Sequence, residues 1–156
     1  MAGALGLPPG QEVALLGAAR LLGSKEVGRL PQEAFRGAIT WEPVRHVLVA
    51  HVSQAMACAP NPVVAAILAH HHNRLDGRGY VPESYTGAPP LEAQVLGLAE
   101  AYVILHGEAS LAVLSASTLE ALREGGWTRG AVESRVVRAL FEALGVLSRN
   151  PVVTGK

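Results

Sequence analysis

Apolar residues recur at the three- and four-residue spacing of amphipathic helices along almost the whole chain, and no run alternates with the two-residue period of a half-buried strand. This pattern predicts an all-α protein, a compact bundle of about six helices. The helix at 91–105 is apolar on nearly every side, so we expect it at the centre of the bundle. The predicted helices cover residues 11–22, 40–57, 62–72, 91–105, 117–123 and 130–144.

Polar residues, proline and glycine mark the expected ends of these helices. Thr40 is a candidate N-cap with Pro43 tolerated in the first turn, and Asn61 is a second candidate cap directly before a proline. Ser117 and Glu120 have the spacing of a capping box at the start of the helix at 117–123. The connection at 73–90 is rich in glycine, proline and polar residues, and its length is typical of functional or disordered loops.

The 156 residues are enough for one domain, so we expect a single domain with its core at about 11–145 and a C-terminal tail at 146–156. Thirteen basic and thirteen acidic side chains balance, which leaves no charge signature of a nucleic-acid-binding or membrane-binding surface. The longest apolar run is far shorter than the roughly 20 residues that span a bilayer. The single cysteine, Cys58, has apolar neighbours typical of a core position, and no secretory leader precedes the first helix. These features predict a cytoplasmic protein.

Three histidines fall on the apolar faces of two consecutive predicted helices. His51 lies on the same stripe as Leu48, and His71 continues the apolar stripe of the helix at 62–72, with His72 one step further round. Neutral imidazole is the commonest metal ligand in proteins, and three of them suffice for an open metal site. The alternative, that each is a core histidine hydrogen-bonded to the backbone, is equally open.

Glu100 is the only charged residue between positions 93 and 105. An unpaired carboxylate is costly to bury, so Glu100 needs a partner if its helix is central. The candidate partners are a metal ion, a histidinium and Arg20. The alternative is that Glu100 reaches a solvent-filled cleft.

Residues 71–80 read His71-His72-Asn73-Arg74-Leu75-Asp76-Gly77-Arg78-Gly79-Tyr80. This segment resembles HHExxDGxGYP, the signature of the HD-GYP domain family, with Val81 in place of the final proline. Active members of that family are metal-dependent phosphodiesterases of cyclic di-GMP. The resemblance extends over roughly residues 13–145 and implies an HD-domain-like helical fold that is shortened at its N-terminus.

The resemblance also implies a set of metal ligands. The pair at 71 and 72 matches the histidines of the signature, His51 resembles a lone ligand on the preceding helix, and Glu100 falls where the family has a metal-binding aspartate. The implied site holds one divalent transition metal, iron, manganese or zinc, on His51, His71, His72 and Glu100. A protein without bound metal is an equal alternative.

The chain departs from the family at residues that hydrolysis needs. The family is named for an adjacent His-Asp pair whose aspartate bridges two metal ions, and the only aspartate here is Asp76, which the signature places in a turn. Asn73 replaces the signature glutamate, Gln94 replaces an arginine, and residues 109–112 replace an arginine-containing phosphate-binding motif. Without two bridged metals, the attacking hydroxide is neither generated nor stabilised as in active members. The resemblance therefore implies a catalytically impaired member.

Three functions follow as alternatives. The first is a regulatory or protein-interaction module linked to cyclic di-GMP signalling, which contacts a GGDEF-type or other signalling protein through Arg74, Asp76, Gly77, Arg78, Gly79 and Tyr80. The second is a residual single-metal phosphohydrolase, resembling a cyclic di-GMP phosphodiesterase, on the four ligands above. The third is a sensor that binds a cyclic dinucleotide without cleaving it. We also expect a homodimer through exposed apolar surface, and the same loop residues are equally consistent with an ordinary solvated loop.

Overall fold

The computed structural model describes residues 1–24, 30–35, 45–79, 87–107 and 114–147. Within these ranges the chain forms seven α-helices and one short 3-10 turn, and it contains no strand. The prediction of an all-α bundle of about six helices is confirmed. The helices are α1 (Ala2–Leu5), α2 (Pro9–Leu22), α3 (Arg45–Ala57), α4 (Pro62–His70), α5 (Leu91–His106), α6 (Ala116–Glu124) and α7 (Ser134–Ala143), and the 3-10 turn is Gln32–Ala34.

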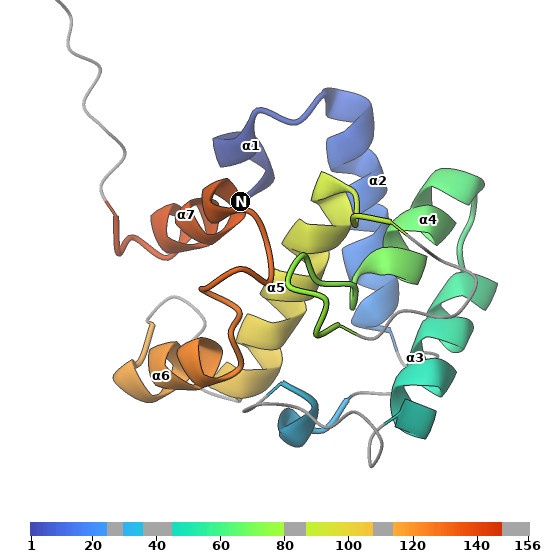
Figure 1. Cartoon of the computed structure of the whole chain (residues 1–156). Coiled ribbons are helices and arrows are strands. Elements are labelled where there is room, and N and C mark those ends of the chain that lie inside the picture. Colours follow the sequence, from blue (N-terminus) through green and yellow to red (C-terminus); the bar gives the residue numbers. More distant parts are fainter. Residues whose placement is uncertain (25–29, 36–44, 80–86, 108–113, 148–156) are drawn as a thin grey trace, which may run out of the picture.

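Helix α5 lies at the centre of the fold (Figure 1) and contacts α2, α4, α6 and α7. Six consecutive residues, from Ala93 to Leu98, are buried, so neighbours cover this part of the helix on all sides. The expectation that this apolar helix is central is confirmed. Helix α4 packs on α2 and α3 as well as on α5.

Helix α4 begins as the sequence predicts. The side chain of Asn61 accepts a hydrogen bond from the backbone N–H three residues later at 3.0 Å, and Pro62 occupies the first helical position. The helix ends at His70, so His71 and His72 lie in the turn that follows it rather than in its last turn.

The N-terminal boundaries differ from the prediction. The sequence pattern does not predict α1, because a single turn that ends at Gly6 in the left-handed conformation is too short to show a helical period. Helix α2 begins at Pro9, two residues before the predicted start, since proline is tolerated in a first turn. The cap and first turn expected at Thr40 and Pro43 lie outside the described residues.

The caps of the last two helices also need correction. Helix α6 is capped by Ser115, whose Oγ accepts a hydrogen bond from the backbone N–H of Thr118 at 3.1 Å, and not by Ser117. Helix α7 begins at Ser134 rather than near Gly130, because a φ of 87° at Gly130 takes the backbone out of the helical conformation.

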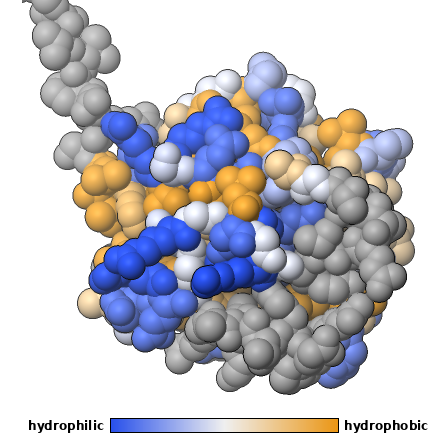
Figure 2. Space-filling view, viewed as in Figure 1, coloured by the Kyte–Doolittle hydropathy of each residue, from blue (hydrophilic) through white to orange (hydrophobic). Residues whose placement is uncertain are grey.

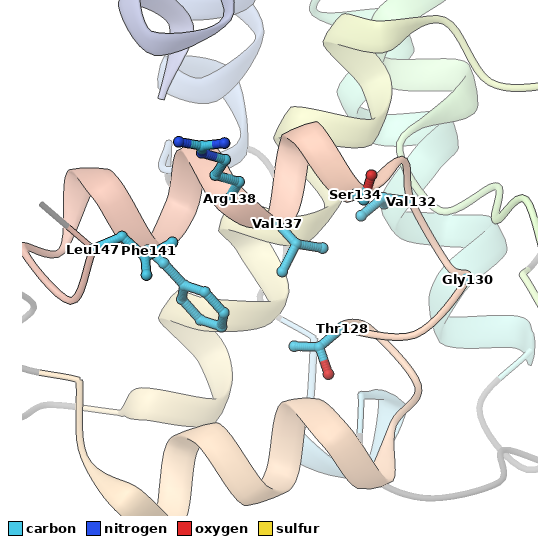
Figure 3. Close-up of a pocket in the computed structure, with 8 residues that line it drawn as sticks. All are labelled: Thr128, Gly130, Val132, Ser134, Val137, Arg138, Phe141 and Leu147. Carbon is cyan, nitrogen blue, oxygen red and sulfur yellow. The ribbon is translucent and has the colours of Figure 1, made fainter. Parts of the chain in front are cut away.

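On the face shown in Figure 2, a band of hydrophobic side chains lies over α7, with hydrophilic side chains on both sides of it. An open groove beside α7 is lined by Thr128, Gly130, Val132, Ser134, Val137, Arg138, Phe141 and Leu147 (Figure 3). Cys58, expected in the core, is exposed at the corner between α3 and α4. Among the helices of the described ranges, none has the length and apolar character needed to cross a membrane.

Candidate metal centre

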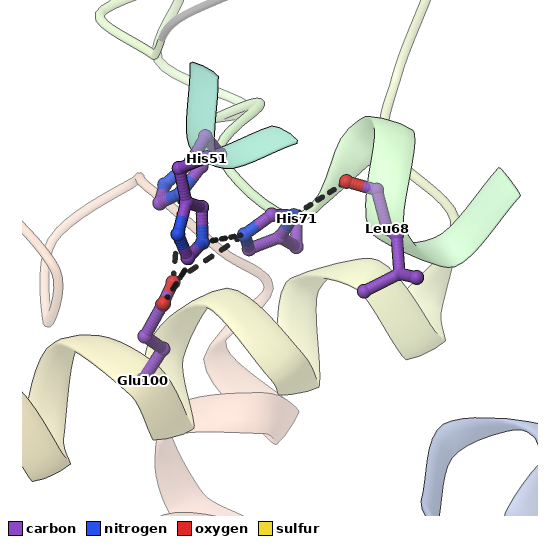
Figure 4. Close-up of polar contacts among 5 residues, drawn as sticks. His51, Leu68, His71 and Glu100 are labelled. Carbon is purple, nitrogen blue, oxygen red and sulfur yellow. Dashed lines mark hydrogen bonds and ion pairs between the residues drawn. The ribbon is translucent and has the colours of Figure 1, made fainter. Parts of the chain in front are cut away.

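Four side chains from three separate segments meet inside the bundle (Figure 4). His51 comes from α3, His71 and His72 from the turn after α4, and Glu100 from α5. One ligand atom from each lies within 4.8 Å of all the others. The structure thus brings together the four residues that the sequence analysis selected.

Helix packing fixes the positions of these side chains. On α3, Leu48 and Ala55 are fully buried on the same face as His51, so the imidazole points into the bundle. Helix α5 approaches the turn after α4 so closely that a Cβ at Gly97 would lie 2.0 Å from the backbone oxygen of His71. Glu100 follows one helical turn later on the same face of α5, and this contact therefore sets its distance from the histidines.

The donor atoms lie close together and are almost shielded from solvent. Nε2 of His51 is 3.2 Å from Oε1 of Glu100, and Nε2 of His71 and His72 are 3.4 and 3.5 Å from Oε2. The histidine side chains are at most 2% exposed, whereas that of Glu100 is 10% exposed. Glu100 therefore pairs with imidazoles. Arg20, which the sequence analysis named as another candidate partner, lies exposed on α2.

Hydrogen bonding determines which imidazole nitrogen faces the centre. Nδ1 of His71 donates to the backbone oxygen of Leu68, so the neutral ring presents the lone pair of Nε2 to the cluster. That lone pair lies 3.3 Å from Nε2 of His51, from which it can accept a hydrogen bond, and 3.4 Å from a carboxylate oxygen of Glu100. The lone pairs of His71 and of this carboxylate oxygen repel one another unless a proton or a cation lies between them.

Two buried atoms of the cluster have no hydrogen bond. Nε2 of His72 and Oε2 of Glu100 are 3.5 Å apart, but neither makes a hydrogen bond of acceptable geometry. Unsatisfied buried polar atoms are uncommon, and an ion at the site is one explanation for them. A divalent cation among the four donors would satisfy both atoms and remove the repulsion between the lone pairs, so the residues present fit a metal ion.

The protonation states of Glu100 and His72 also suit metal binding. Burial alone would raise the pKa of Glu100, but the surrounding imidazoles of His51, His71 and His72 hold that pKa far below its ordinary value. Burial lowers the pKa of His72 well below its ordinary value. An ionised carboxylate and a neutral imidazole are the forms that bind a metal.

Acid should destabilise the metal-free protein. Unfolded His72 takes up a proton below about pH 6.5, while the folded state keeps this ring neutral, so the free energy of unfolding should fall as the pH decreases from there. Glu100 adds a second loss below about pH 4.5, because its carboxylate is protonated first in the unfolded chain. Urea unfolding at pH 7.5 and 5.5 measures the first effect. His72→Gln should flatten the dependence, while a change at the exposed His46 should not; equal stability at both pH values would contradict the expectation.

We expected Arg74 to contact a partner from the surface of the loop, but the structure buries this residue. Its side chain is buried, with Nε and Nη2 3.0 and 2.6 Å from the two carboxylate oxygens of Asp76, and Nη1 donating to the backbone oxygen of Gly125 at 2.6 Å. The guanidinium also lies 4.8 Å from the centre of the Trp127 ring. Its binding capacity is thus used inside the chain, because the loop folds back onto the segment between α6 and α7.

The rest of the expected interaction loop is compact where it is described. Burial would raise the pKa of Asp76, but the hydrogen bonds and charge of Arg74 hold it below its ordinary value. Asp76 also accepts the backbone N–H of Arg78 at 3.1 Å, and Gly77 has a φ of 71°. Gly77 and Arg78 are exposed, and Tyr80 lies outside the described residues.

The positions that depart from the family signature have structural partners. The amide of Asn73 is 2.9 Å from Nδ1 of His70. Gln94 donates to the backbone oxygen of Pro89 at 3.0 Å and accepts from the backbone N–H of Glu133 at 2.8 Å, which ties the start of α5 to that of α7. Residues 109–112 lie outside the described ranges.

The sequence analysis did not single out Gly97, Phe35 or Trp127, all of which lie around the cluster. The only local signal was a glycine inside an otherwise apolar helix, which often marks a close backbone approach. A second signal came from composition: phenylalanine and tryptophan are scarce, with two of each in the chain.

No model of a known protein family matches the chain, and no curated protein or solved structure matches it either. The chemistry assigned to the cluster therefore depends on the geometry and electrostatics of its own four side chains.

Proposed function

We propose that this chain binds one divalent transition-metal ion and acts as a catalytically impaired HD-GYP-like module, regulatory or protein-binding, in cyclic di-GMP signalling. One observation carries the metal site: four donors from three segments converge within 4.8 Å, and two of their buried atoms have no hydrogen bond. The ligands are His51, His71, His72 and Glu100.

The donor set favours zinc, manganese or iron over calcium and magnesium. Imidazole nitrogen suits the first group, whereas the second group prefers a shell made of oxygen atoms. The hydrogen bond from His71 to the backbone oxygen of Leu68 is the kind of outer contact that orients a metal-binding histidine. When bound, the ion would supply a positive charge that neutralises Glu100 and could polarise one bound water.

The impaired activity is inferred from the carboxylates. A pair of metals about 3.5–4 Å apart requires an anion that bridges them. The only aspartate in the chain, Asp76, has both of its carboxylate oxygens bonded to Arg74. Among the described residues, Glu100 is the only one that brings a carboxylate to the cluster, which supports one ion rather than two.

A protein partner of the GGDEF type is proposed for the loop after the histidines. Asp76 and Arg74 fix the loop internally, while Gly77 and Arg78 are exposed on its outer side. A loop that is already ordered loses less conformational entropy on binding, which favours recognition by a partner. Metal binding at the adjacent histidines would hold the start of the same loop.

The second candidate is a residual single-metal phosphohydrolase. It is favoured by the 10% exposure of Glu100, because the three histidines are almost fully shielded and the carboxylate is the part of the cluster nearest to solvent. Water would reach the cluster on the side of this carboxylate, and a bound ion would lower the pKa of that water, as metal-assisted hydrolysis requires.

Metal analysis of the purified protein after incubation with zinc, manganese and iron tests the proposal. We expect about one ion per chain, and we expect His71→Ala to lose it while His46→Ala, which changes an exposed histidine outside the cluster, retains it. Absence of bound metal from the unaltered protein would overturn the metal site.

Assays with cyclic di-GMP separate the two candidate functions. The regulatory module should produce no turnover at any metal loading, because it lacks the bridged pair of ions. Turnover that disappears in both His71→Ala and Glu100→Gln would instead support the phosphohydrolase and refute the impaired module.

A further inference from the structure

The geometry points to Arg74 as a positioning residue for the metal centre, which acts on the imidazole of His72 through Trp127 and Phe35. This inference rests on the metal site proposed above. Arg74, Trp127 and Phe35 are far apart in the sequence and meet only in the folded chain. None of the three is a proposed metal ligand.

The guanidinium of Arg74 is held on three sides. Asp76 binds it with both carboxylate oxygens, the backbone oxygen of Gly125 binds a second edge, and the Trp127 ring covers one face at 4.8 Å. The residue is only 6% exposed. A planar group with several donors in a fixed fork meets all three demands, and the ammonium of lysine does not.

From Trp127 the contact continues to the metal centre. The ring of Trp127 lies 5.9 Å from that of Phe35, and the ring of Phe35 lies 5.9 Å from that of His72. Both aromatic residues are about 1% exposed, so the row is packed without solvent between its members.

The backbone supports the same row. A Cβ at Gly125 would lie 2.3 Å from the backbone oxygen of Phe35, so the peptide that accepts the hydrogen bond from Arg74 also lies directly against Phe35. On the other side of the loop, a Cβ at Gly79 would lie 2.4 Å from the backbone oxygen of His72. Arg74 thus anchors the loop where close backbone contacts leave both Phe35 and His72 little room to move.

His72 needs such support more than His71 does. The ring of His71 is oriented by the hydrogen bond from its outward nitrogen, Nδ1, to Leu68, and the nitrogen of His72 that faces the cluster, Nε2, makes no hydrogen bond. The ring of His72 is instead flanked by the rings of His71 at 3.9 Å and Phe35 at 5.9 Å. Its angle towards the centre is therefore set by packing, and Phe35 is the outer wall of that packing.

The test is a cobalt titration of Arg74→Lys and Phe35→Leu, with Arg138→Lys as the matched control. Arg138 also binds a carboxylate, that of Glu142 at 2.9 Å, but it lies exposed on α7. We expect both test variants to bind cobalt roughly 10- to 100-fold more weakly, the usual cost of losing an outer contact of a ligand. We also expect the visible spectrum of saturated, folded protein to change, which a simple loss of stability would not produce. The control should behave like the unaltered protein.

Each result supports or overturns the inference. If Arg74→Lys does not fold, as judged by circular dichroism, Phe35→Leu decides, because this change keeps an apolar side chain at the wall and alters only the packing on His72. Unchanged cobalt affinity and spectrum in the folded variants would overturn the positioning role while leaving the metal site intact. If the unaltered protein binds no cobalt, the proposed metal site itself fails.

Discussion

Replacing Gly97 with alanine should lower the free energy of unfolding by about 2–3 kcal/mol, the upper part of the usual range for overpacking a core. Alanine normally stabilises a helix interior relative to glycine by roughly 0.5–1 kcal/mol. Here the added Cβ would lie 2.0 Å from the backbone oxygen of His71, and neither atom can rotate away. The clash therefore outweighs the helix propensity, and α5 must move from the turn after α4.

Gly17→Ala in α2 is the matched control for this change, measured by urea unfolding. A Cβ at Gly17 would lie 3.7 Å from a methyl group of Val64, which is ordinary van der Waals contact. This variant should be neutral or more stable, since only the propensity acts. Gly97→Ala should also weaken metal binding, because Glu100 moves with α5. Equal stability changes in the two variants would show that α5 does not press on the turn at Gly97.

Local sequence patterns sufficed for the elements that are longest and most regular. Asn61 and Pro62 fix the start of α4 by a side-chain hydrogen bond and a preset φ, both of which are properties of adjacent residues. The central place of α5 followed from its uniform apolarity. The inward direction of His51 was also predictable, because the face of a helix follows from its period. Its meeting with Glu100 was expected only from the family resemblance.

Contacts between distant segments were beyond these patterns. In sequence, Arg74 resembles an exposed loop residue, and it is buried only because Gly125 and Trp127 meet it from the other end of the chain. The close approach of α5 to the turn at His71 likewise depends on two backbones that no local pattern relates. The error at α6 has a different origin, since Ser115 and Ser117 are both suitable caps and the backbone conformation selects the first.

The proposed metal site would bind an ion without hydrolysing a phosphodiester. The four proposed ligands are positioned by the packing of α3, α4 and α5 and by the aromatic row, whereas a second metal would need a further carboxylate, and among the described residues only Glu100 brings one to the cluster. A single bound ion would then contribute mainly to stability and to the order of the loop that begins at His72. This role predicts a large effect of metal on unfolding.

Zinc present at about a thousand times its dissociation constant should raise the free energy of unfolding by about 4 kcal/mol, because the folded protein alone has the assembled site. The stabilisation should be largest at neutral pH, where Glu100 is ionised and His72 is neutral. It should decline in acid, since protons compete with the metal for imidazole nitrogen. Urea unfolding with and without zinc, at pH 7.5 and 5.5, measures both effects.

Binding of zinc elsewhere on the surface must be separated from binding at the cluster. Cys58 and His46 are both exposed and are of types that bind zinc, so they provide the competing explanation. Cys58→Ser and His46→Ala should retain the full stabilisation, whereas His51→Gln should lose most of it although it lies on the same helix as His46. Stabilisation that survives in His51→Gln and vanishes in Cys58→Ser would assign the effect to the surface, and the buried cluster would then be a network of imidazoles around a carboxylate without a metal.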